Sequence, residues 1–217
     1  MKNLLIKEMR LASSPLSYIF LCAALMTLLP GYPILMSAFF ICFGIFHSFQ
    51  NARENNDTLY SVLLPVKKRD FVRAKFAFIC LIQAAGFLLC SALTVLRMTA
   101  LSGAKPYVNN ALMNATPVFL AFVLLIFSAF NVLFAGGFFK TVYKIGMPFL
   151  RFGIAVFFLI AAAEALPHLP GLQFLRSPAG ERTGIQLIAL GVCAVIYCVS
   201  TFCICRKSEQ RFERIDL

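Results

Sequence analysis

The sequence is poor in charged residues and contains no tryptophan. Only 13% of its 217 residues are Asp, Glu, Lys or Arg, whereas soluble domains contain about 25%. This shortage excludes a soluble globule, because too little polar surface is available to cover one. Disorder is also excluded, since 60% of the residues are hydrophobic. The composition therefore predicts a membrane protein with several spans, anchored at the membrane interfaces by tyrosine in place of tryptophan.

Signatures of catalysis are missing as well. The sequence has no Walker A motif, which excludes nucleotide hydrolysis by that route, and it has neither HExxH nor GxSxG. Its two histidines, His47 and His168, fall at opposite ends of predicted spans and so cannot share a metal. The eight cysteines lie in apolar runs without ligand spacing, so we interpret them as small buried hydrophobes. We expect no enzyme activity, no cofactor in this chain and no nucleic-acid partner.

Six apolar runs are candidates for membrane spans. The first long run is divided by Pro30-Gly31-Tyr32-Pro33, which forms either a turn between two spans or a break in one helix. The positive-inside rule favours the turn, because six spans place 16 of the 20 Lys and Arg residues on one side. The predicted spans cover residues 14–29, 34–49, 76–96, 117–139, 149–166 and 184–205. We predict an all-α membrane protein with one transmembrane domain over residues 1–217 and both termini in the cytoplasm.

Two further features follow from this topology. Residues 1–11 contain no cleavage site for a signal peptide; they are either a short interfacial helix or an ordinary basic flank. Polar residues inside the spans, among them Gln83, Asn131 and Thr201, are expected to form hydrogen bonds between helices.

The loop at residues 50–75 is the most charged stretch of the chain, yet residues 62–66 in its middle are apolar. A simple connector has no reason to expose such a patch. The loop therefore predicts a short bent element that docks a partner on the cytoplasmic side; an interfacial helix that only contacts lipid is the alternative. Pro65 favours an extended residue before it and a new helix after it, which runs into the third span.

The same loop resembles small bacterial permeases of the type-2 ATP-binding-cassette (ABC) transporter superfamily. The resemblance rests on an acidic and polar stretch after the second span, a Leu-Pro-Val turn and a basic entry to the third span. In this sequence those segments are Glu54-Asn55-Asn56-Asp57, Leu63-Leu64-Pro65-Val66-Lys67, Asp70-Phe71-Val72 and Ala74-Lys75. Lys67 stands where many relatives have a serine that caps the next helix.

The resemblance implies a permease subunit without catalysis of its own, in the plasma (inner) membrane of a bacterium. Such a subunit pairs with a second permease subunit, identical or different, and exports a substrate using ATP bound by a separate cytoplasmic ATPase. The loop would be the coupling helix, with a second contact through Lys7 and Arg10 of the N-terminal helix. The residues that carry over to the coupling contact are Glu54, Asp57, Leu64, Pro65, Val66, Lys67, Asp70 and Lys75.

Glu164 is the one carboxylate within a predicted span, and His168 follows four residues later. An ionisable group inside a membrane is a functional candidate, so the pair is either an outer gate or a local structural contact. Two alternatives to the permease stay open from the sequence. One is an intramembrane protease or acyl transferase that uses Glu164 and His168, and the other is a non-catalytic membrane scaffold.

Overall fold

The structure is a computed structural model that describes residues 2–63, 65–108, 110, 112–141, 144–172, 175 and 183–215. All regular secondary structure among these residues is helical, as predicted. The α-helices are α1 (Lys2–Lys7), α2 (Pro15–Ile19), α3 (Met36–Glu54), α4 (Asp57–Leu63), α5 (Lys68–Thr99), α6 (Lys105–Val108), α7 (Pro117–Ala129), α8 (Gly136–Thr141), α9 (Gly146–Ala165) and α10 (Thr183–Glu213). Two π-helical segments, η1 (Glu8–Ala12) and η3 (Phe130–Ala135), and two 3-10 helices, η2 (Phe20–Leu28) and η4 (Leu166–His168), complete the set.

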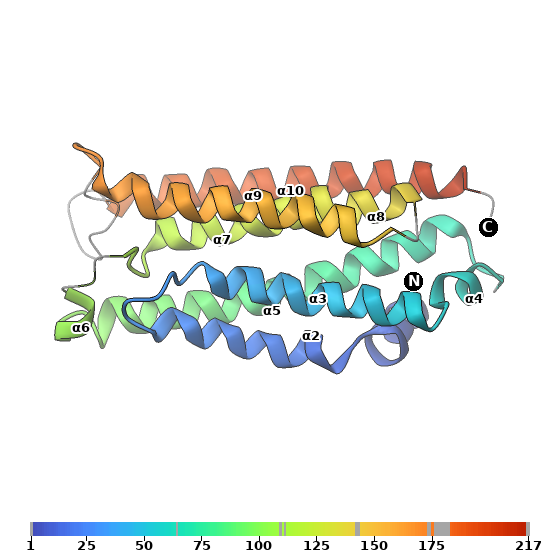
Figure 1. The fold of residues 1–217 in the computed structure, drawn as a ribbon, viewed down its shortest axis with the longest axis horizontal. Coiled ribbons are helices and arrows are strands. Elements are labelled where there is room, and N and C mark those ends of the chain that lie inside the picture. Colours follow the sequence, from blue (N-terminus) through green and yellow to red (C-terminus); the bar gives the residue numbers. More distant parts are fainter. Residues whose placement is uncertain are drawn as a thin grey trace.

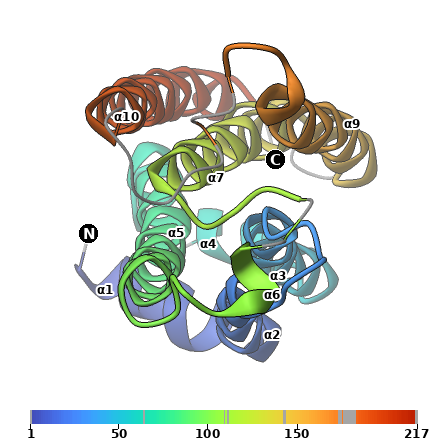
Figure 2. The same cartoon turned by 90° about the vertical axis from the view of Figure 1, so that its left-hand side faces the viewer.

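The long helices form two layers. One layer contains α2, α3 and α5, and the other contains α7, α9 and α10 (Figures 1 and 2). At one end of the molecule lie α1, α4, the start of α5 and the end of α10, and we call this the α4 end (Figure 1). The opposite end carries α6 and the turn before α3, and we call it the α6 end (Figure 1). Helices α5 and α10 run along most of the length between these two ends (Figure 1).

The Pro30–Pro33 segment is a turn between two neighbouring helices, as the hairpin interpretation predicts. Gly31 has φ +72°, a left-handed conformation that glycine adopts without strain. The helices approach closely at Gly44, where an added Cβ would lie 2.8 Å from the Cβ of Phe20. Next to this contact the Ser17 hydroxyl donates to the Gly44 carbonyl at 2.6 Å. The absent side chain at Gly44 thus allows the two backbones to pack together.

Local sequence sets where the other long helices begin. Lys67 is extended, with ψ 135°, and α5 starts at the next residue without a side-chain cap. This follows the prediction that a new helix begins just after Pro65. Pro117 occupies the first turn of α7, a position where its missing N–H costs no helical hydrogen bond. The π-helical η3, which contains Asn131, then adds a wide turn before α8.

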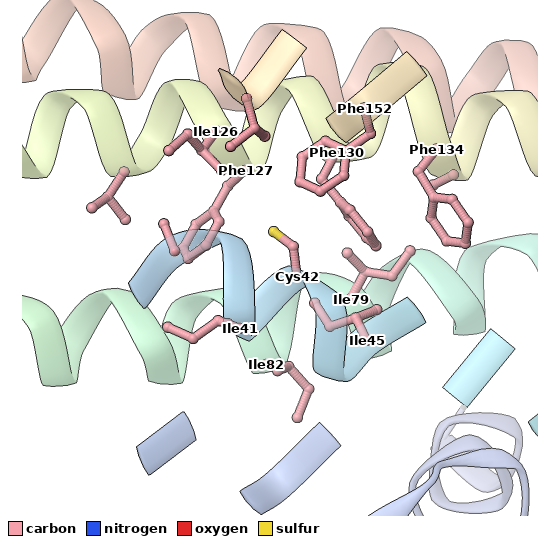
Figure 3. Close-up of a cluster of buried hydrophobic side chains, with 14 of the residues drawn as sticks. Ile41, Cys42, Ile45, Ile79, Ile82, Ile126, Phe127, Phe130, Phe134 and Phe152 are labelled. Atoms are coloured by element: carbon pink, nitrogen blue, oxygen red, sulfur yellow. The ribbon is translucent and has the colours of Figure 1, made fainter. Parts of the chain in front are cut away.

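The hydrophobic core lies between the two layers. Figure 3 shows Ile41, Cys42 and Ile45 of α3 facing phenylalanines of α7 and η3, with Ile79 and Ile82 of α5 beside them. These side chains are almost completely buried. Several aromatic rings stack or meet edge to face there; Phe130 and Phe152 have centroids 5.1 Å apart. Such contacts add to the packing of the two layers beyond the area that they bury.

Four helical segments are long and apolar enough to cross a membrane. They are Lys68–Thr99, Pro117–Thr141, Gly146–His168 and Thr183–Glu213, and each contains one of the predicted spans. A fifth candidate is the pair Asn3–Ala12 and Pro15–Leu28, which is bent by 95° between its two parts. The predicted second span, residues 34–49, coincides with α3, which does not meet the same test within the described residues. The count of six spans and the orientation of the termini stay predictions.

Candidate functional site

Helix α4 is a short amphipathic element at the α4 end, between α3 and α5. Asn56 separates it from α3 in a left-handed conformation with φ 51°, which asparagine tolerates better than most residues. The outward face of α4 is apolar: Tyr60 is 66% exposed and Leu63 is 75% exposed, and Leu59 is exposed beside them. The exposed Pro65 follows, whereas Leu64 lies outside the described residues. Of the apolar stretch predicted at residues 62–66, Leu63 and Pro65 are therefore at the surface.

The opposite face of α4 is fixed by charge. The Asp57 carboxylate forms ion pairs with Lys7 of α1 and, at 3.3 Å, with Lys75 of α5. The Lys7 ammonium also donates a hydrogen bond to the Ser61 hydroxyl, one turn along α4. Two other helices thus hold α4 by its polar side, and its apolar side is left facing outward.

Glu8 and Lys75 form the most buried ion pair of the site, with Nζ and Oε2 2.7 Å apart and each side chain no more than 4% exposed. The Lys75 ammonium also lies 5.0 Å from the centre of the Phe71 ring. We call Lys7, Glu8, Asp57 and Lys75 the buried cluster. It contains two cations and two anions, so the charges balance. Balance matters here because an unpaired charge at such burial costs several kcal/mol, about 3–5 when one partner is removed.

The pKa of Asp57 reflects this environment. Burial raises the pKa, but the positive charges of Lys75 and Lys7, together with the hydrogen bonds that they donate, outweigh it. The pKa of the Asp57 carboxyl consequently lies below its usual value. The carboxylate is therefore ionised at neutral pH and keeps both lysines in place.

A second set of ion pairs joins the start of α5 to the end of α10. The Arg73 guanidinium donates to both oxygens of Glu209, at 2.9 and 3.0 Å, and Arg69 pairs with Glu213 one turn further along. Lys68 donates to the carbonyl of Ile215 at 2.7 Å. We call the pairs Arg69–Glu213 and Arg73–Glu209 the α5–α10 ladder. Unlike the buried cluster, it lies mostly at the surface, since both arginines are at least 40% exposed.

The structure brings together only some of the residues predicted for the coupling contact. Asp57 and Lys75 meet in the buried cluster. Glu54 and Lys67 are exposed, and Glu54 accepts a hydrogen bond from Gln50 on its own helix. Asp70 lies 4.0 Å from Arg73 on α5. Val66 is half-buried next to the exposed Pro65.

The sequence analysis missed Glu8, Glu209 and Glu213. One available signal was the rarity of acidic residues, since the chain has only nine. Another was spacing: Arg69 and Arg73 are four residues apart, as are Glu209 and Glu213, so each pair presents its charges on one helix face. Matching spacings of opposite charge predict two helices that pair side by side.

A polar network crosses the middle of the bundle. The Gln83 amide of α5 donates to Asn131 at 2.9 Å, and Asn131 donates to the Thr201 hydroxyl of α10 at 2.9 Å. Tyr197 of α10 donates to Gln83 at 2.8 Å. The expected hydrogen bonds between helices are thus present at Gln83, Asn131 and Thr201. They join α5 to α10 a second time, well away from the α5–α10 ladder.

Glu164 lies near the α6 end, where its Oε2 accepts a hydrogen bond from the backbone N–H of Met113 at 2.7 Å. Its other oxygen accepts no hydrogen bond from the described residues. His168 is exposed in η4, one turn later. No group of three or more His, Cys, Asp or Glu side chains able to hold a metal occurs among the described residues. The carboxylate of Glu164 thus contacts the loop before α7.

Comparison with known proteins identifies the family of the chain. The family model described as "ABC-2 family transporter protein" matches residues 3–207, which is nearly the whole chain. Comparisons with curated proteins and with solved structures gave no match. The family match includes α4, the buried cluster, three of the long apolar segments in full and the fourth up to residue 207. The chain belongs to the ABC-2 family of transporter membrane proteins.

Proposed function

We propose that this chain is the permease subunit of an exporter in the inner membrane, driven by a separate cytoplasmic ATPase. Two permease subunits, identical or different, enclose the pathway, and the ATPase binds the ATP. The chain crosses the membrane six times with both termini in the cytoplasm. Family membership supports the permease role, and the distribution of Lys and Arg supports the orientation.

Within this proposal α4 is the coupling helix, and its exposed apolar face is the observation that carries the assignment. Tyr60 and Leu63 protrude at the surface, on the side of α4 opposite the buried cluster. Apolar side chains at the centre of an interface supply much of its binding energy, and charged residues around them set the orientation. Glu54 and Lys67 are exposed, precede and follow α4 in the sequence, and would provide those charges.

The buried cluster supports a mechanical role for α4. A coupling element must move with the membrane helices, so it needs a firm connection to them. Asp57 and Lys75 provide that connection, because their ion pair joins α4 directly to α5. When ATP brings the two ATPases together, the α4 helices are drawn along, and the permease population shifts toward an outward-open state. Glu164 and His168 would then lie at the outer gate.

The test is co-purification with the cognate cytoplasmic ATPase, with Leu63→Asp and Pro65→Asp as variants. Both residues are exposed, so the membrane domain should fold normally. We expect each variant to lose most of the bound ATPase and the ATP-dependent transport, because a charge would be buried in the interface. Leu169→Asp, an equally polar change at an exposed residue of the α6 end, is the control and should retain both.

Retention of ATPase and transport by Leu63→Asp and Pro65→Asp would show that α4 is not the coupling helix. Loss in the Leu169→Asp control as well would point to a general effect of the added charge. Because the ATPase is cytoplasmic, a specific loss at Leu63 would also support the proposed orientation.

A further inference from the structure

A surface cavity of about 310 Å³ opens between α5 and α10, beside the α5–α10 ladder. Its lining is mixed. Phe202 and Cys205 of α10 supply the apolar part, and Arg73, Arg206 and Glu209 supply the polar part. The volume suits the headgroup of a single lipid rather than a long chain. This combination of an aromatic wall with guanidinium groups differs from the apolar groove between α3 and α9, which is lined by phenylalanine and aliphatic side chains.

The charges in this cavity do not cancel. Arg73 and Glu209 neutralise each other through two hydrogen bonds. Arg206 has no carboxylate within ion-pair distance among the described residues, and its guanidinium lies over the Phe202 ring at 5.2 Å. The lining therefore keeps one net positive charge. Contact with the ring also restricts the Arg206 side chain, whose guanidinium can donate paired hydrogen bonds to an anion.

The cavity lies at the point along α5 and α10 where their apolar stretches end. On α10, no charged residue lies between Thr183 and Cys205, and Arg206 is the first one after this apolar stretch. On α5, Lys75 is the last charged residue before an apolar run that extends to Arg97. Both walls of the cavity thus stand where an apolar span meets charged residues, which is the level of lipid headgroups. Phe202, 62% exposed, lies one turn toward the apolar side.

We propose that this cavity binds the headgroup of one anionic phospholipid. Arg206 donates to the phosphate oxygens. Nη1 of Arg73 lies 4.0 Å from the Asp70 carboxylate and makes no hydrogen bond to a described residue, so it donates a further one. Phe202 contacts the first part of an acyl chain. The net positive charge of the lining favours an anionic lipid over a zwitterionic one. The headgroup of a zwitterionic lipid contains a positive charge, which the lining repels.

The experiment measures phosphatidylglycerol bound to the purified full chain by native mass spectrometry, over a range of lipid concentrations. Arg206→Gln removes the unpaired charge, and Lys207→Gln, an equal charge change at an exposed neighbour that does not line the cavity, is the matched control. We expect Arg206→Gln to weaken the first binding event about tenfold, as loss of one charge-assisted contact does, and Lys207→Gln to leave it unchanged. Phosphatidylcholine should bind the wild type about tenfold more weakly than phosphatidylglycerol.

Three outcomes would overturn the proposal. Equal weakening by both variants would show general attraction of anionic lipid, and no weakening by Arg206→Gln would remove the site altogether. Displacement of the lipid by millimolar inorganic phosphate would show a site for free phosphate instead. Because Arg206 is exposed, its loss should not affect folding, which circular dichroism and the elution volume check. Arg206→Lys, which keeps the charge but loses the planar fork, should bind with intermediate strength.

Discussion

The first turns of α5 carry two sets of ion pairs that differ in burial rather than in distance. Lys75 pairs with Glu8 at 2.7 Å inside the buried cluster, and Arg73 pairs with Glu209 at 2.9 Å in the α5–α10 ladder. Only the first pair is enclosed on both sides. Water screens a charge at the surface, so its loss costs little, whereas a charge deprived of its partner in the interior stays desolvated. The buried cluster thus holds one side of α5 by ion pairs that are costly to break. The α5–α10 ladder holds the other side by ion pairs that break at little cost.

The largest effect should come from Lys75→Met. This change leaves Glu8 without its closest partner inside the protein and should lower the free energy of unfolding by about 3–5 kcal/mol. Thermal unfolding in detergent, followed by circular dichroism, measures the loss. The matched control is the double variant Lys75→Met with Glu8→Met, which removes both charges and should recover most of the stability. A double variant as unstable as the single one would mean that packing, not charge, causes the effect.

Acid should have a smaller effect, through Asp57. Its pKa is lowered in the folded protein, so the carboxylate contributes stability that is fully present above the unfolded value of about 4. That contribution is lost as the pH falls through the lowered folded pKa. We expect the unfolding temperature to decline below about pH 4 and this part of the decline to be absent in Asp57→Asn. Parallel pH curves for the two proteins would contradict the assignment.

The smallest effects should come from the α5–α10 ladder. Arg69→Gln should leave stability almost unchanged, because both partners are exposed. Arg73→Gln should cost more than Arg69→Gln but less than Lys75→Met, since Glu209 is buried although Arg73 is not. Unfolding at low and high salt separates the two sites further: salt should weaken the ladder and leave the buried cluster unaffected. A ladder variant as damaging as Lys75→Met would end the distinction between the two sites.

The sequence predicted the helices well because their determinants are local. Apolar runs locate the segments Pro117–Thr141 and Gly146–His168 within a few residues, and Pro65 marks where α5 can begin. For the polar contacts between helices, the sequence predicted the kind of interaction but not the partners. Gln83 and Asn131 were expected to form hydrogen bonds to other helices, and which residues would accept or donate them was not known. Hydrophobic periodicity shows which residues are apolar, but it does not show which helices are neighbours.

The partners of Lys75 show the same limit more sharply. Glu8 lies 67 residues away along the chain, and no pattern in the sequence around either residue predicts their contact. The pair forms because α1 and η1, which carries Glu8, pack against α5, an outcome of the whole fold. The exposed face of α4 was easier to foresee, since an apolar stretch within a charged loop is visible in the sequence itself.

The length of α5 has a geometric consequence. At about 1.5 Å per residue, its 32 residues form a rod of about 48 Å. The part from Lys75 in the buried cluster to Arg97 near the α6 end accounts for about 33 Å of it. There the Arg97 guanidinium donates to the carbonyl of Thr27 at 2.6 Å, so the far end of the rod is attached to the first hairpin. Gln83 lies about 12 Å from Lys75 and about 21 Å from Arg97 along the axis. If the polar network at Gln83 serves as a fulcrum, a 1 Å shift at Lys75 becomes a shift of about 1.8 Å at Arg97, so α5 is a lever with its longer arm at the α6 end.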